Sequence, residues 1–168
     1  GFKNEVQIQV TVFSADMQND PDVLAGVASS ACLAVSEAPF LGPIGCVRVG
    51  RINGVFVVNP THEQLDESDL DLVFVGSEKE LVMFEGAAKE ISEDDFNAAL
   101  AFALEATKPL IAAQKELAAR AGKAKRAITV KVVPEEILDE AKKVGGNRIV
   151  PALLTPGKLA RETAWKTL

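Results

Sequence analysis

The sequence is poor in the residues on which most catalytic sites depend. Its 168 residues include one histidine, His62, so Ser–His–Asp and Cys–His arrangements could use that residue alone. His62 lies in a polar stretch typical of a turn, and we expect a structural role for it. No glycine-rich phosphate loop is present, because Gly42-Pro-Ile-Gly45 precedes a predicted strand instead of a helix. The spacing of zinc ligands is also missing.

Cysteine, long apolar runs and positive charge are scarce as well. Cys32 and Cys46 lie in apolar surroundings, which predicts two buried thiols and a reducing, cytoplasmic setting. No apolar run approaches the roughly 20 residues of a membrane span. We also find no secretory signal peptide at the start. The net charge of −6 and the pI near 4.9 argue against a stand-alone nucleic-acid-binding protein.

A helix that lacks a polar face is predicted within residues 16–39. Asp20 is the expected N-cap and Pro21 suits the first helical position. Nearly every residue from Val23 to Val35 is small or apolar, so we expect this helix to be buried on several sides. Its N-terminal loop is where such a fold could hold an anion.

Alternation and turn signals predict strands on both sides of this helix. Residues 5–14 alternate between apolar and polar side chains, as in a half-buried strand. Asn53-Gly54 lies between two further strand-like runs and predicts a type I′ hairpin. Residues 69–76 and 81–85 are expected to pair across a short turn. Together these elements predict an α/β (α+β) fold with a mixed sheet.

The second half of the chain has helical patterns. Ser92 and Asp95 form a capping-box pattern ahead of a long apolar stripe, in which Pro109 predicts a kink or a restart. Positive charge gathers after Gly122. A helix is expected from Pro134, broken at Gly145-Gly146, followed by short helical pieces up to Leu168.

Two groups of charged residues are the candidate sites. The acidic residues could hold a hard cation such as Mg²⁺; they are Asp66, Glu67, Asp69 and Asp71. Alternate residues of a strand share a face, so Asp69 and Asp71 could converge on one ion. The competing interpretation is a solvated entry to the strand. The candidates for contact with RNA or with an assembly are basic. They are Arg48, Arg51, Lys123, Lys125 and Arg126. For the basic segment, the competing interpretation is a solvated linker.

The sequence resembles bacterial polynucleotide phosphorylase in seven separate segments. These are residues 1–8 (GFKNEVQI), 19–25 (NDPDVLA), 39–45 (PFLGPIG), 49–54 (VGRING), 59–65 (NPTHEQL), 67–73 (ESDLDLV) and 86–94 (GAAKEISED). The resemblance implies the second half of the first of that family's two ribonuclease-PH-like cores. It implies three parts: a partial core over residues 1–121, a basic linker over 122–133, and part of an all-helical linker domain over 134–168.

The resemblance also implies an activity for a longer parent protein. The family degrades RNA from the 3′ end with phosphate, releases nucleoside diphosphates, forms a homotrimeric ring and uses Mg²⁺ or Mn²⁺. Its second core carries the active site. The implied partners are RNA and the remaining segments of the same protein, with no membrane and a cytoplasmic location.

Several residues depart from the family's catalytic core. The serine-rich, phosphate-binding loop is replaced here by Asn19-Asp-Pro-Asp-Val23, whose carboxylates would repel phosphate. Leu65 and Asp71 align with its metal-binding aspartates, and Val73 with its lysine. We therefore expect no catalytic, cofactor or metal residue in this chain, with Asp71 as the one candidate metal ligand.

Three functions follow as hypotheses. The first is a non-catalytic scaffold portion of the phosphorolytic enzyme, which supports the trimeric ring and the RNA channel. The second is a free-standing protein-interaction domain derived from this core. The third is an independent nuclease with a metal ion on Asp69 and Asp71. Because half of a duplicated core exposes sheet edges, we expect the isolated chain to aggregate or oligomerise without its missing half. A stable monomer would favour the second hypothesis.

Overall fold

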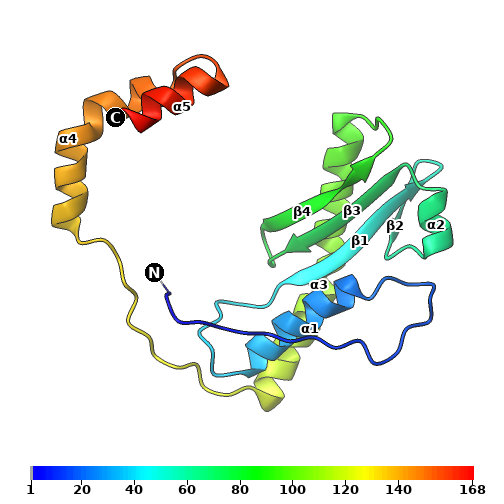
Figure 1. Ribbon diagram of the computed structural model, residues 1–168. Helices are drawn as coiled ribbons and strands as arrows, with labels where there is room; N and C mark the ends of the chain where they lie inside the picture. The colour runs from blue at the N-terminus through cyan, green and yellow to red at the C-terminus, as the bar shows by residue number, and fades with distance from the viewer. Residues whose placement is uncertain (1) are drawn as a thin grey trace. The chain divides into compact units, whose positions relative to one another are not determined.

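The chain forms two compact units in the computed structural model, which describes residues 2–168. One unit comprises residues 6–128, and the other groups residues 129–168 with residues 2–5. The first unit is a four-stranded sheet with three helices, and the second is helical (Figure 1). The α+β class and the helical segment that follows it are therefore confirmed.

The sheet has the order β2-β1-β3-β4, and every neighbouring pair is antiparallel. Its strands are β1 (Gly45–Ile52), β2 (Val55–Val58), β3 (Leu70–Gly76) and β4 (Leu81–Ala88). The expected mixed sheet is therefore wrong for the described residues. The reason is that residues 5–14, the predicted first strand, take no part in it.

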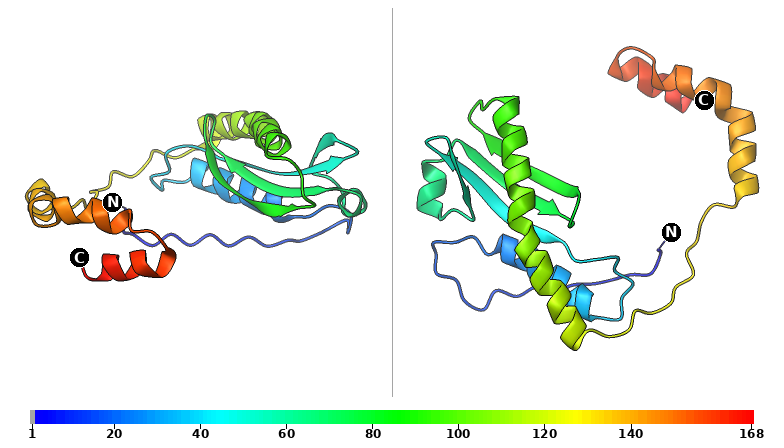
Figure 2. Two further views of the ribbon diagram at one scale, coloured as in Figure 1. Left: turned by 90° about the horizontal axis from the view of Figure 1, so that it is seen from above. Right: turned by 180° about the vertical axis from the view of Figure 1, so that it is seen from behind.

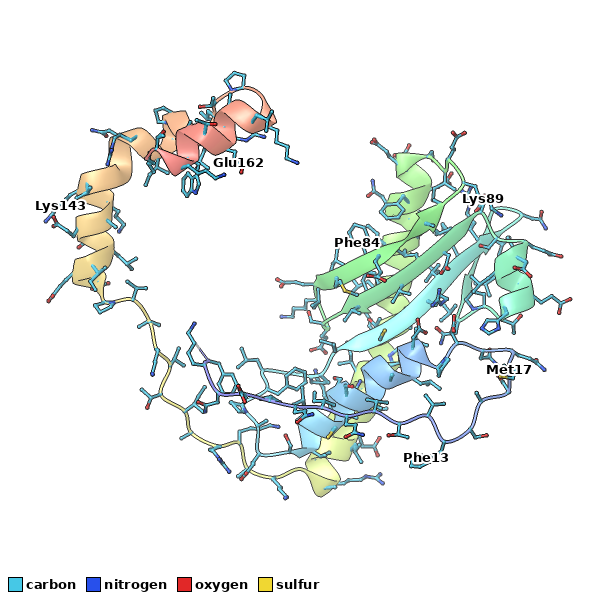
Figure 3. All side chains as sticks on the ribbon, viewed as in Figure 1. Phe13, Met17, Phe84, Lys89, Lys143 and Glu162 are labelled. Carbon is cyan, nitrogen blue, oxygen red and sulfur yellow. The ribbon has the colours of Figure 1, made fainter. Side chains whose placement is uncertain are left out.

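Residues 5–14 form no strand ladder, although their alternation is that of a strand. Val6 and Val12 are each 52% exposed, and Phe13 is 96% exposed. Figure 3 shows Phe13 projecting from this segment, away from the sheet. A strand is defined by hydrogen bonds to a neighbour. No such neighbour lies beside this segment among residues 2–168, so the alternation alone cannot make a strand.

The predicted hairpin is confirmed. Asn53 and Gly54 connect β1 to β2 with φ angles of 50° and 79°, the positive values that a type I′ turn requires. The turn fixes the register in which Arg51 lies opposite Phe56. Arg48 and Arg51 are three residues apart in β1. Because side chains alternate along a strand, they lie on opposite faces of the sheet.

The core lies between one face of the sheet and helix α3 (Glu93–Ala121). Seen from behind, α3 runs across this face (Figure 2). Ser92 caps the helix, and its hydroxyl accepts a hydrogen bond from the Asp95 amide. The helix continues through Pro109, so the expected restart does not occur. The buried apolar residues of this core are Val47, Val49, Leu70, Leu72, Phe74, Ala99 and Ala103.

Helix α1 (Asp22–Val35) packs against β1 and α3 along one stripe. A Cβ atom on Gly26 would lie 3.0 Å from the Cys46 Cβ atom, so the small residue does permit a close approach. The expected burial on several sides holds only in part, because Leu24 is 67% exposed, and Cys32, predicted to be a buried thiol, is exposed too.

The start of α1 also differs from the prediction. Pro21 occupies the N-cap position, and no side chain caps the helix. Asp20 turns instead toward an arginine of β1, described below. The polar loop between β2 and β3 contains an unpredicted short helix, α2 (His62–Asp66), which a reciprocal capping box of Thr61 and Gln64 stabilises.

The second unit contains α4 (Glu135–Leu153) and α5 (Lys158–Lys166). The predicted break at Gly145-Gly146 is wrong, because α4 continues through both residues. Glycine inside a helix costs about 1 kcal/mol relative to alanine, which weakens a helix without ending it. In the described residues, no helix is both long and apolar enough to cross a membrane.

Candidate functional site

Arg48 is the centre of a cluster of carboxylates. Its Nη1 atom lies 2.6 Å from Oδ1 of Asp71 on β3, and its Nη2 atom lies 2.6 Å from Oδ2 of Asp22. The same Nη2 atom is 3.2 Å from Oδ2 of Asp20. The arginine side chain is only 12% exposed. One guanidinium therefore ties the N-terminus of α1 to two strands of the sheet.

The charge balance of this cluster is negative. Burial lowers the pKa of Arg48, but its hydrogen bonds to Asp71 and Asp22 outweigh burial and leave the pKa above its ordinary value. The guanidinium therefore stays charged and faces three carboxylates. A phosphate placed here would meet an excess of negative charge and find no free arginine fork.

Arg51 forms a second cluster on the face that α3 covers. Its Nε atom is 2.9 Å from Oδ1 of Asp69 and its Nη2 atom 2.7 Å from Oδ2, a bidentate pair. Its Nη1 atom lies 2.7 Å from Oδ2 of Asp95, in the first turn of α3. Hydrogen bonds from Arg51 hold the pKa values of Asp69 and Asp95 below their ordinary range. This cluster joins β1, β3 and α3.

Asp69 and Asp71 do not converge on one point, contrary to the hypothesis of a shared cation. Asp69 precedes β3 and pairs with Arg51, whereas Asp71 pairs with Arg48. No cluster of three or more His, Cys, Asp or Glu residues suited to a metal ion occurs within residues 2–168. The residues present therefore do not fit the Mg²⁺ or Mn²⁺ ion that the resemblance implies, because arginines already hold these carboxylates.

The basic segment after α3 is bound to the end of α1. The Lys123 amide donates to the Val35 carbonyl oxygen at 2.9 Å, and the Arg126 amide donates to that of Glu37 at 2.8 Å. The Arg126 guanidinium also pairs with the Glu37 carboxylate. The end of α1 and the segment after α3 thus run side by side. Sequence reasoning did not predict this pairing.

Lys125 makes the densest contacts of this segment. Its ammonium donates to the carbonyl oxygens of Leu33, Ala34 and Ser36 at 2.8, 2.9 and 2.7 Å. The last carbonyl groups of a helix lack helical partners and carry partial negative charge. Lys125 therefore satisfies the C-terminus of α1. The sequence near Lys125 does not indicate this role, because at least 89 residues separate the lysine from the carbonyl groups that it binds.

The remaining polar features have local partners. His62 lies with its Nε2 atom 3.6 Å from Oδ1 of Asp20, and its amide donates to the Gln18 carbonyl oxygen. A cleft of about 710 Å³ lies between the loop before β1 and the β3–β4 turn. Its lining includes Phe40, and its residue Lys115 pairs with Glu78 at 2.6 Å. Sequence reasoning did not predict this cleft.

Comparison with known proteins places these features in a family. Residues 42–106 match the second domain of the 3′ exoribonuclease family, ribonuclease-PH type. The resemblance to polynucleotide phosphorylase is confirmed. The chain is 48% identical over 137 residues to a polyribonucleotide nucleotidyltransferase of Geobacter sp. (strain M21), covering 82% of this chain and 20% of that protein.

Further relatives carry the same name. The protein of Methylacidiphilum infernorum (isolate V4) is 44% identical over 162 residues, which are 96% of this chain and 23% of the relative. That of Chlorobaculum parvum (strain DSM 263 / NCIMB 8327) is 50% identical over 138 residues, 82% of this chain and 19% of the relative. This chain thus spans about a fifth of the length of the curated relatives it matches.

Proposed function

We propose that this chain is the non-catalytic first-core portion of a phosphorolytic 3′-to-5′ exoribonuclease that acts in RNA degradation. In this proposal it supports the trimeric ring and RNA channel of its parent in the cytoplasm, and its partners are the other segments of that parent and RNA. The observation that carries the proposal is the 42–50% identity to polyribonucleotide nucleotidyltransferases over most of the chain.

The arginine clusters support a scaffolding role. In phosphorolysis, phosphate attacks the 3′-terminal phosphodiester and a nucleoside diphosphate leaves, which requires a site that accepts two phosphate groups. Arg48 and Arg51 are already held by five carboxylates: those of Asp20, Asp22, Asp69, Asp71 and Asp95. Their charge is used to join α1, α3 and the sheet. Any Mg²⁺ or Mn²⁺ of the parent would bind in the other core.

The proposed parts of the chain are a partial core over residues 1–121, a basic linker over 122–133 and a partial helical domain over 134–168. Along the chain, the division between the two compact units falls after residue 128. Part of the basic linker is bound to α1, as the contacts of Lys125 show. We therefore expect residues 122–126 mainly to stabilise the core. Contacts with RNA or with neighbouring subunits would come from Lys123 and the residues that follow it.

The alternative function is a free-standing protein-interaction domain. The half-exposed valines of the unpaired segment 6–12 favour it, because an extended apolar segment without a neighbouring strand can pair with another chain. A chain of this kind would be a stable monomer before it met its partner. Its assembly state therefore separates the two functions.

A chimera tests the main proposal. The matching segment of the Geobacter relative is replaced by this chain, and the purified protein is given poly(A) and phosphate. We expect ADP release within about threefold of that of the unmodified relative, together with an unchanged mass by light scattering. The isolated 168-residue chain should release no ADP above the blank.

Two controls give the experiment its meaning. Deleting the same segment from the relative should abolish both assembly and ADP release. A chimera with the Asp71→Asn change should keep its activity, because Asp71 pairs with Arg48 and does not hold a metal ion. Loss of ADP release in that variant without loss of assembly, or an inactive and unassembled chimera, would contradict the proposal.

A further inference from the structure

The outer edge of β4 has no partner in the described residues. β4 is the last strand of the sheet and pairs only with β3 (Figure 1). All eight of its residues are exposed. Leu81, Val82, Met83 and Phe84 follow one another with exposed fractions of 43%, 59%, 44% and 45%. A row of backbone N–H and C=O groups along this strand therefore faces outward beside a run of apolar side chains.

β4 has few of the features that usually protect an edge strand. Such strands are commonly short, or carry lysine or proline, or are covered by a helix or loop. β2, at the opposite edge, has four residues, so it offers little to pair with. β4 is twice as long, contains no lysine, arginine or proline, and carries a single charge at Glu85. Its one irregularity lies at its start, opposite Val75 and Gly76.

We propose that β4 is a pairing edge at which two copies of this chain join antiparallel, β4 to β4, into one continuous eight-stranded sheet. This inference does not rest on the proposed function. A second copy is the favoured occupant because β4 is complementary to itself. It offers apolar residues in its first half and small ones, Gly86 to Ala88, in its last half, so antiparallel pairing sets each half against the other.

The charge on β4 selects one register. In a two-fold antiparallel pair, directly opposite residues lie on the same face of the sheet. A register centred on Glu85 would place two carboxylates opposite each other, which is unfavourable. The register centred on Phe84 places Glu85 opposite Met83 of the second copy instead. In this register the two Phe84 rings meet at the axis, beside Phe96 of α3, whose ring centroid is 5.5 Å from that of Phe84.

Phe84 is accessible for such a contact. Figure 3 shows it on β4 at the margin of the sheet, and nearly half of its surface is exposed despite the packing on Phe96. Aromatic pairs across neighbouring strands strengthen backbone pairing. A strand edge with one aromatic pair predicts a dimer of micromolar strength at best, so concentration is the variable to control.

The test is the oligomeric state of the 168-residue chain. We expect sedimentation velocity between about 1 and 200 µM to show a monomer–dimer equilibrium. Val82→Lys should weaken it at least tenfold, because lysine on an edge strand opposes pairing. Val55→Lys is the matched control, since Val55 is an exposed valine of the other edge, β2, and this change should leave the dimer intact. Circular dichroism checks that both variants fold.

Cysteine cross-linking tests the register independently of stability. In a Cys32→Ser background, Met83→Cys and Glu85→Cys chains are mixed and oxidised. We expect a disulfide between the two variants and little within either alone. A monomer at 200 µM, a dimer unaffected by Val82→Lys, or cross-linking of Glu85→Cys to itself would overturn the proposal. So would a larger assembly that persists in the Val82→Lys variant, since it would assign association to another surface such as segment 6–12.

Discussion

Arg48 of β1 donates a hydrogen bond of 2.6 Å to the Asp71 carboxylate of β3, and the same guanidinium holds Asp22 at the start of α1. Asp71, which aligns with a metal-binding aspartate of the family's catalytic core, thus pairs with the guanidinium of Arg48. The negative charge that would attract a divalent ion is used to hold three elements of the core together.

Arg48→Met should lower the free energy of unfolding of the core by about 1–3 kcal/mol. Removing one partner of a fully buried pair costs about 3–5 kcal/mol, but the carboxylates here are 39–46% exposed, so solvent screens them. Urea unfolding at pH 7 measures the change. Arg120→Met removes an exposed arginine paired within α3 and should change stability by about 0.5 kcal/mol or less. Equal effects for both variants would contradict the structural role of Arg48.

The Arg48 cluster also shows where sequence reasoning stops. Strand alternation is enough to place Arg48 and Arg51 on opposite faces of β1. The partner depends on the β1–β3 register, in which Gly50 lies opposite Asp71, and on the loop before α1, which brings Asp20 and Asp22 to the same place. Registers between strands that are not joined by a short turn are not encoded locally, so the cluster could not be predicted.

The Arg51 cluster should make stability depend on pH in the acid range. Because the pKa values of Asp69 and Asp95 are lowered in the folded state, their contribution is present above about pH 4 and is lost as the pH falls through their folded pKa values. Arg51→Gln should therefore destabilise the chain most at pH 7, and the difference from the unmodified chain should shrink below pH 4.

Urea unfolding at pH 7, 5, 4 and 3 tests this dependence. Arg120→Gln serves as the control, since its partner Glu116 is 63% exposed. NMR titration of the aspartate carboxyl groups gives a second readout, in which the Asp69 and Asp95 midpoints should rise in Arg51→Gln. A stability difference that stays constant from pH 7 to pH 3 would show that these carboxylates do not contribute in the way described.

Lys125→Met should release the segment after α3 from the end of α1. Three carbonyl groups would lose a charged donor. Since the segment is exposed, we expect a local loss of about 1 kcal/mol, which corresponds to about fivefold faster hydrogen exchange of the Lys123 and Arg126 amides. Lys131→Met is the control, because Lys131 lies beyond these contacts and should leave both amides unchanged. Protection that is equal in the two variants would contradict the assigned contacts.

Local signals predicted the elements that local interactions determine. The Asn53-Gly54 turn, the Ser92 cap, β3 and the start of β4 all follow from residues within a few positions of one another. The errors arose where distant residues decide. Residues 5–14 have the alternation of a strand but lack a neighbouring strand, and α1 has the composition of a buried helix but leaves Leu24 and Cys32 exposed. In the second unit, Gly145 and Gly146 remain helical because flanking residues continue the helix on both sides.

Gly45→Ala should destabilise the core where β1 meets α3. A Cβ atom at this position would lie 2.4 Å from the Thr107 Cβ atom and 3.0 Å from its carbonyl oxygen, so β1 and α3 would have to separate. Overpacking of this kind costs about 1–3 kcal/mol.

Gly146→Ala, in α4, is the matched control because nothing lies within 4 Å of its added Cβ atom. It should increase helicity, since alanine is favoured over glycine by up to about 1 kcal/mol inside a helix. Urea unfolding and circular dichroism measure both changes. Stability unchanged by Gly45→Ala would mean that β1 and α3 are not packed as closely as the contact with Thr107 requires.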